Sequence, residues 1–183
     1  MIFRVSFSLQ NKQTILSRST EMVAPDITGD ARRVFEVLKA GGIAICPSDV
    51  GYALFTVSPK PLEKIFITKK RKPEKRHPMM GTYEFHKELQ IVESLQAEIV
   101  KTLVCDFRLP LAVAKYRPDH PLIKNFSEEQ LEASTAKETI CISIEPGNLC
   151  TEIAKLCHEA NLSLQGSSAN LTGTGMLLKS TNQ

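Results

Sequence analysis

The sequence predicts a single domain of the α/β or α+β class, in which helices flank a β-sheet. Short apolar runs rich in β-branched residues alternate with longer segments of helical periodicity, which is the pattern of a sheet covered by helices. The 183 residues fit one domain and can bury a core, and 42% hydrophobic and 23% charged residues are ordinary for a globular protein. No internal repeat or low-complexity linker interrupts the chain, so we expect one domain over residues 1–183.

The first elements are predicted from alternation, caps and breakers. Residues 2–9 (IFRVSFSL) alternate apolar and polar side chains, which favours a half-buried strand, although the basic and acid-free first twenty residues also resemble a transit peptide. Asp30 can cap a helix over residues 30–39, and Gly41 suits a left-handed stop after it. The elements that follow are strands at 43–46 and 53–57 with a turn at 47–52 between them, and a helix that starts at Pro59.

The second half of the chain continues the alternation. Residues 139–144 (TICISI) predict the clearest strand, because β-branched residues dominate. Residues 148–160 predict an amphipathic helix with Ile153 and Cys157 on its apolar side. The other elements are a helix over 92–104, a strand over 110–115, and a brief strand over 162–165 that leads into a polar loop, GSSANLTGTG, over 166–175.

Composition and missing motifs exclude several classes of function. A net charge of +3 falls short of the basic excess of a dedicated DNA-binding module. The five cysteines are odd in number and lack CxxC spacing, which indicates reduced, mostly buried thiols in an intracellular protein. No apolar run approaches the roughly 20 residues of a membrane span, and neither a metal-ligand spacing nor a P-loop, HExxH or GxSxG motif is present. We expect a cytoplasmic protein, with mitochondria as the alternative location.

Three stretches could carry chemistry. The segment KKRKPEKRH (69–77) places six basic residues and one acid directly after a predicted helix, whose dipole favours cations there. It is either an anion site or a solvated face. The loop at 166–175 either brings backbone N–H groups to a phosphate or is a polar surface loop. The turn at 47–52 exposes Ser48, Asp49 and Tyr52, or is an ordinary junction between strands.

In this order the three stretches resemble the YrdC/YciO family. The matching patterns are GG-strand-P-[ST]-D-x-x-Y-x-L at 41–54, K-x-R at 69–71 and S-A-N-x-[ST]-G at 168–173. The resemblance covers residues 30–175, with a C-terminal end shorter than the family's. It implies a twisted, open mixed sheet flanked by helices, a fold shared with a riboflavin-pathway synthase. The best-known members are threonylcarbamoyl-AMP synthases, nucleotidyltransferases that condense ATP, bicarbonate and L-threonine for a tRNA modification.

The resemblance also implies a site. ATP would be a substrate that brings Mg²⁺ with it, because no protein cage for the metal is visible. No residue is assigned as catalytic. The residues expected to bind ATP and its phosphates are Lys69, Arg71, Thr139, Ser168 and Asn170, and the candidates for the substrate pocket are Ser48, Asp49, Tyr52 and Ser143.

The chain departs from the family pattern mainly on the threonine side. Val50, Ala112 and Ser143 stand where the family has two threonines and an arginine. The histidine expected after Pro78 is missing, with His77 or His86 as its candidate replacement. We therefore expect phosphate binding to persist while the amino-acid substrate has changed or the activity has been lost. Two alternatives stay open, namely a module that binds double-stranded RNA and a degenerate accessory protein of the same fold.

Overall fold

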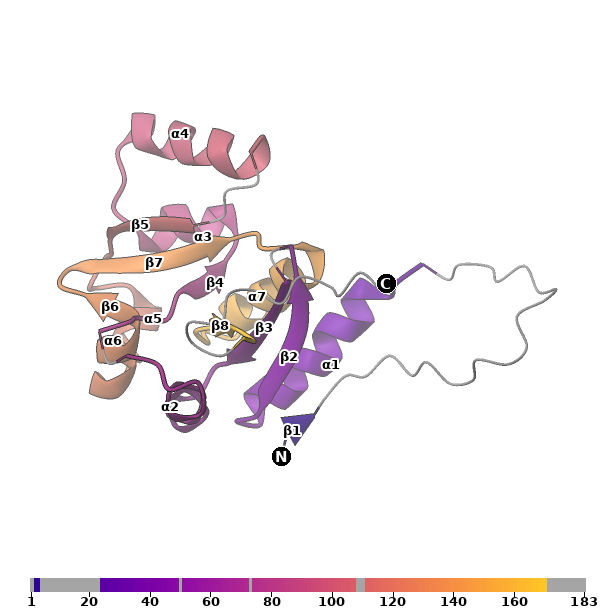
Figure 1. Ribbon diagram of the computed structural model, residues 1–183. Coiled ribbons are helices and arrows are strands. Elements are labelled where there is room, and N and C mark those ends of the chain that lie inside the picture. The colour runs from indigo at the N-terminus through magenta and orange to yellow at the C-terminus, as the bar shows by residue number, and fades with distance from the viewer. Residues whose placement is uncertain (1, 4–23, 50, 73, 108–110, 171–183) are drawn as a thin grey trace, which may run out of the picture.

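The computed structural model describes residues 2–3, 24–49, 51–72, 74–107 and 111–170 (Figure 1). In these residues, eight strands form one mixed sheet in the order β1-β2-β3-β8-β4-β7-β5, with β6 paired to β7. The strands are β1 (Ile2–Phe3), β2 (Ile43–Ser48), β3 (Gly51–Thr56), β4 (Met79–Gly81), β5 (Leu111–Lys115), β6 (Thr135–Ala136), β7 (Thr139–Ile144) and β8 (Gln165–Ser168). The helices are α1 (Ile27–Lys39), α2 (Pro59–Thr68), α3 (Tyr83–Leu89), α4 (Ser94–Cys105), α5 (Pro121–Lys124), α6 (Glu128–Ser134) and α7 (Asn148–Glu159). The prediction of an open mixed sheet flanked by helices is confirmed.

The sheet turns sharply where β8 meets β4. These two strands share one pair of facing residues, Met79 and Gln165, whereas β2 with β3 and β5 with β7 each pair along five residues. In Figure 1, β2 and β3 accordingly run steeply across the direction of β5 and β7. The turn brings the end of β7 to the end of β2, where the N–H of Asp49 donates to the carbonyl oxygen of Pro146 at 3.0 Å.

Two hydrophobic cores lie on opposite faces of this sheet. Consecutive strand residues point to opposite faces, and Met80 packs into the first core while Met79 packs into the second. The first core joins α1 and α7 to β2 and β3 around Phe55, which is fully buried. The second joins α3 and α5 to β4, β5 and β7 around Ile142.

The sequence-based elements are largely confirmed. The strand at 139–144 has the predicted bounds, and the helices and strands predicted over 92–104, 110–115 and 148–160 correspond to α4, β5 and α7. Gly41 has a φ of 80°, which confirms the left-handed stop after α1. Of the strand predicted over 2–9, the described part is β1, and the rest lies outside the described residues.

Three boundaries were wrong. Asp26 caps α1, because its Oδ1 accepts from Gly29 N–H at 2.9 Å, and Asp30 lies in the first turn instead. The turn predicted over 47–52 is shorter, because Pro47 continues β2. A proline, which has no backbone N–H, is tolerated there because β1 pairs only with Ile43 and Ala44, so no strand among the described residues needs an N–H from Pro47. The last strand runs from Gln165 to Ser168, not over 162–165, and therefore takes in the start of the predicted loop.

Four cysteines have described side chains, and all four are free. Burial raises the pKa of Cys46 to about 11 and that of Cys150 and Cys157 to about 12, so these thiols stay protonated and unreactive at neutral pH. This agrees with the prediction of reduced, buried cysteines. None of the helices in the described part of the chain is long and apolar enough to cross a membrane.

Candidate anion-binding site

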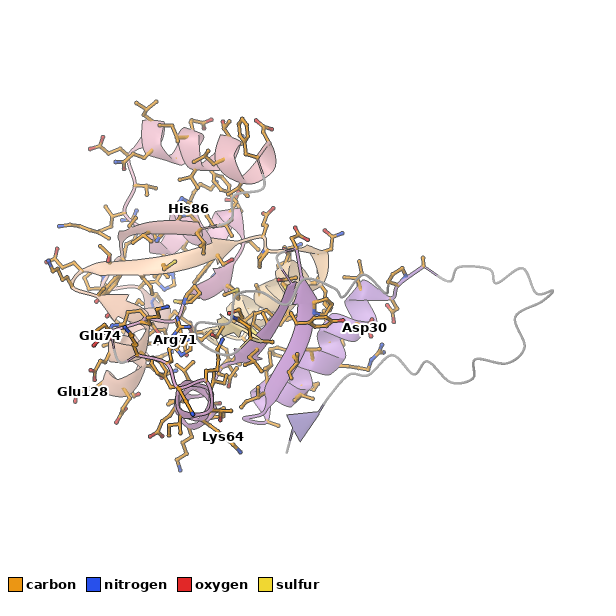
Figure 2. All side chains as sticks on the ribbon, in the orientation of Figure 1. Asp30, Lys64, Arg71, Glu74, His86 and Glu128 are labelled. Atoms are coloured by element: carbon orange, nitrogen blue, oxygen red, sulfur yellow. The ribbon has the colours of Figure 1, made fainter. Side chains whose placement is uncertain are left out.

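The basic segment is positioned by α2. This helix buries Leu62 and Ile65 and ends at Thr68, so that Lys69 is its C-cap. Lys70 then adopts a φ of 49°, which reverses the chain locally. As a result, Lys69 and Arg71 point inward while Lys70 and the other lysines of the segment, Lys72 and Lys75, are exposed. Figure 2 shows Arg71 in the middle of the molecule between α2 and the sheet, whereas Lys64 points outward from α2.

Lys69 reaches across to β8. Its side chain is only 5% exposed. The ammonium group donates to Ser167 Oγ at 2.9 Å, to Ser168 Oγ at 3.3 Å and to the carbonyl oxygen of Ser168. These contacts bring the K-x-R segment together with Ser167 and Ser168 in the folded chain.

Arg71 meets the same serine. Its Nη1 donates to Ser167 Oγ at 3.2 Å, and its Nη2 donates to the carbonyl oxygen of Arg76 at 2.8 Å. The guanidinium carbon lies 5.9 Å from the centroid of the Phe66 ring, within the range of a cation–π contact. The buried Nε has no hydrogen-bond partner among the described residues.

His77 belongs to the same cluster and lies against Gly166 of β8. The imidazole is fully buried, and its Nδ1 lies 3.1 Å from the carbonyl oxygen of Gly166. Because a carbonyl oxygen only accepts, Nδ1 carries a proton. Burial lowers the pKa of His77 to about 4, although the Gly166 hydrogen bond opposes the shift, and the charges of Arg71 and Lys69 lower it further. His77 is therefore neutral at physiological pH, with an unprotonated Nε2.

The cluster is positive and lacks a carboxylate. No acidic residue in the described part of the chain pairs with Lys69 or Arg71. Burial lowers the pKa of both groups, and the neighbouring charges of Arg71 and Lys75 lower that of Lys69 further. Burying two cations side by side is unfavourable unless hydrogen bonds and an anion compensate. An anion beside Arg71 would supply the compensating negative charge.

An open cavity adjoins the cluster. It has a volume of about 1350 Å³ and lies between α2, α6 and the start of β2. Phe66, Arg71 and Arg76 contribute to its wall, as do three acidic residues, Glu63, Glu129 and Glu132. Of the residues predicted for the site, all of which are described, only Arg71 lines this cavity.

The other predicted residues lie in different places. Thr139 starts β7, and its hydroxyl donates to the Ala136 carbonyl at 2.8 Å; it forms no hydrogen bond to Lys69 or Arg71 in the described residues. Ser168 is exposed beside Lys69, and Asn170 is half-buried two residues further on.

None of the candidates for the substrate pocket forms a hydrogen bond to Lys69 or Arg71 among the described residues. Ser48 Oγ donates to the Gly51 carbonyl across the β2–β3 turn at 2.7 Å, and Tyr52 is 64% exposed. Asp49 lies against Gly147, because a Cβ built on that glycine would come 2.8 Å from Asp49 Oδ1. Ser143 faces Met80 in the register of β4 and β7, and thus the side of the sheet opposite to Ser167.

Sequence reasoning missed Ser167 and named His77 only as a possible substitute. Ser167 is the hydroxyl on which both cations converge, yet the family pattern begins at Ser168. Strand alternation could have identified it: once β8 extends through Ser168, Ser167 falls on the face opposite to Gly166, which packs on Phe55. His86, the other candidate histidine, is buried away from the cluster with Gln90.

The fold resembles several solved structures. A hypothetical protein of Streptococcus mutans matches with a TM-score of 0.69 and 26% identity, over 76% of this chain and 56% of that chain. E. coli YciO matches with a TM-score of 0.60 and 16% identity, over 82% and 68%. P. abyssi Sua5, solved in complex with L-threonine, matches with a TM-score of 0.57 and 15% identity, over 80% and 40%.

These matches define the fold class. The chain has a YrdC/YciO-like fold, as its sequence motifs predicted. It spans about half the length of the Streptococcus protein and less of Sua5. No protein-family model matches the chain, and a comparison with curated proteins finds no match.

Proposed function

We propose that this chain binds the polyphosphate of ATP at the Lys69–Arg71 cluster and acts as a threonylcarbamoyl-AMP synthase-like nucleotidyltransferase. One observation carries the proposal: two inward-facing cations meet at the hydroxyl of Ser167 with no carboxylate partner among the described residues. A polyphosphate supplies the missing negative charge. When pyrophosphate leaves, a fixed guanidinium stabilises the charge that develops on the departing oxygens.

The likeness in fold supports the proposal for the remaining substrates. The likeness to a Sua5 solved with L-threonine supports a small amino acid as acceptor. Bicarbonate as the carbon source and tRNA threonylcarbamoyladenosine modification as the context are what the resemblance to the YrdC/YciO family implies. No group of acidic, histidine or cysteine residues in the described ranges could hold a metal ion, so Mg²⁺ would enter as part of the ATP complex. Val50 and Ser143 favour an amino acid other than threonine.

Calorimetric titration with ATP·Mg²⁺ tests the phosphate site. Arg71→Ala is expected to weaken binding about tenfold or more, because a charge-assisted hydrogen bond contributes about 1.5–3 kcal/mol. Lys72→Ala removes an exposed charge from the same segment and serves as the matched control, with an unchanged affinity expected. Absence of binding by the wild type, or equal affinities for wild type and Arg71→Ala, would refute the proposal.

Turnover tests the reaction. Release of pyrophosphate from ATP, with formation of the carbamoyl-adenylate of the amino acid, should depend on both bicarbonate and an amino acid, and a panel of small amino acids would identify the acceptor. ATP binding without turnover under any of these conditions would instead support the accessory-protein alternative.

One observation favours RNA as a second ligand. Lys70, Lys72 and Lys75 are all exposed on one short segment, where they could contact a phosphate backbone. Affinity for a double-stranded RNA should then fall steeply with salt, and the triple replacement by alanine should weaken RNA binding while leaving ATP binding unchanged. An RNA affinity that does not respond to salt would exclude this second function.

A further inference from the structure

The two cations of the K-x-R segment have different hydrogen-bonding environments. An ammonium group has three N–H donors. Lys69 Nζ has three acceptors, and all of them belong to Ser167 and Ser168 of β8. Lys69 also does not contribute to the wall of the adjoining cavity. Its donors are therefore saturated by the protein before any ligand arrives.

Arg71 has donors in excess. A guanidinium carries five N–H donors in a planar fork. The described residues supply two acceptors to it, Ser167 Oγ and the Arg76 carbonyl, and the Nε has no partner among them. Arg71 also lines the cavity between α2 and α6. It can thus offer hydrogen bonds to an anion without giving up those that hold it in place.

We propose that Lys69 is a positioning residue that fixes the end of β8, and that Arg71 is the member of the pair that contacts the anion. By bonding to two consecutive serines, Lys69 holds the strand just before Ala169, whose N–H donates to the Tyr52 carbonyl at 2.8 Å. The identity of the anion rests on the proposed function, whereas the role of Lys69 does not require a ligand.

A matched pair of variants tests this division. Lys69→Met and Arg71→Met each remove one positive charge and keep an unbranched apolar stem, so their long-range electrostatic effects are alike. Hydrogen exchange of the Ala169 amide, measured without ligand, should be at least tenfold faster in Lys69→Met and unchanged in Arg71→Met. The Gln90 amide, which donates to the His86 carbonyl at 2.9 Å in the second core, reports global destabilisation and should not change in either variant.

Binding of inorganic triphosphate at a single NaCl concentration tests the other half. Both variants lose the same long-range attraction, so a difference in affinity between them reports the loss of a direct hydrogen bond to the anion. Arg71→Met should therefore weaken triphosphate binding at least tenfold more than Lys69→Met does. If Lys69→Met weakens binding as much as Arg71→Met and leaves the exchange of Ala169 unchanged, Lys69 contacts the anion and the proposal is overturned.

The outcomes separate this inference from the proposed function. If the wild type binds neither ATP nor triphosphate, the proposed function fails, and the exchange data still decide the role of Lys69. Should Lys69→Met not fold, Lys69→Arg provides the same exchange measurement with the charge kept. An arginine cannot place its fork on the same three acceptors, so Ala169 should again exchange faster; wild-type protection in this variant would contradict the positioning role.

Discussion

Replacing His77 with asparagine is expected to remove a pH-dependent part of the stability of the protein. In the folded chain, His77 is fully buried and neutral, and its Nδ1 donates to the Gly166 carbonyl. An asparagine amide can occupy the position of Nδ1 and donate in the same way, but it does not titrate between pH 4 and pH 8. The variant therefore keeps a similar contact and removes the titration.

The magnitude follows from the difference between the folded and unfolded pKa. Burial lowers the pKa of His77 from 6.5 to about 4 in the folded state. As pH falls below 6.5, the unfolded chain takes up a proton that the folded chain refuses, so stability is present above this value and is lost on acidification. The loss amounts to about 2 kcal/mol at pH 5 and approaches about 3 kcal/mol near pH 4.

Urea denaturation at pH 7.5 and pH 5.0 measures this effect. The free energy of unfolding of the wild type should fall between the two pH values by about 2 kcal/mol more than that of His77→Asn. Other histidines and carboxylates titrate in both proteins, so their contributions cancel in the difference. If the two proteins lose the same stability to within about 0.5 kcal/mol, His77 is not buried as a neutral group and the reasoning fails.

Two further predictions concern the helix cap and the packing of β8. Asp26→Ala should destabilise the protein by about 1 kcal/mol in urea denaturation, because Gly29 N–H loses its acceptor. Asp30→Ala should destabilise the protein less than Asp26→Ala does. A larger loss of stability in Asp30→Ala would show that Asp30 caps the helix instead. Gly166→Ala should destabilise by about 1–3 kcal/mol, since its Cβ would lie 2.9 Å from carbon atoms of the Phe55 ring. Phe55→Leu in the same chain should recover part of that loss, and strict additivity of the two substitutions would contradict the proposed clash.

Much of the fold was predictable because its longer elements have clear local patterns. The strand TICISI was predicted from its β-branched residues, and the helix α7 from its helical periodicity. Both signals lie within the segment itself and do not depend on which other element packs against it. The elements that were missed are short. β4 has only three residues, Met79–Gly81, which point to alternate faces of the sheet and are all buried. Neither an alternation of apolar and polar residues nor the length of the segment could therefore identify it.

The site was predictable in its composition but less so in its geometry. The cluster of basic residues after α2 and the serine-rich stretch near the end of the chain were both found as candidates for an anion site. Neither sequence pattern indicates which face of the sheet Ser167 occupies or that His77 is buried. Nor does either indicate that Ser143 lies on the face opposite to Ser167. Each of these depends on the register between strands, which is set by pairings such as Met80 with Ser143.

The sequence by itself determined where charge, apolar periodicity and chain reversals fall along this protein, because these depend on neighbours within a few residues. Only the tertiary structure decided which of the six basic residues at 69–77 turn inward and what they meet. Lys69 and Ser167 are 98 positions apart, and their hydrogen bond exists because β8 lies between β3 and β4 beside the end of α2. Contacts of this kind are fixed by the closing of the whole sheet, which no local pattern encodes.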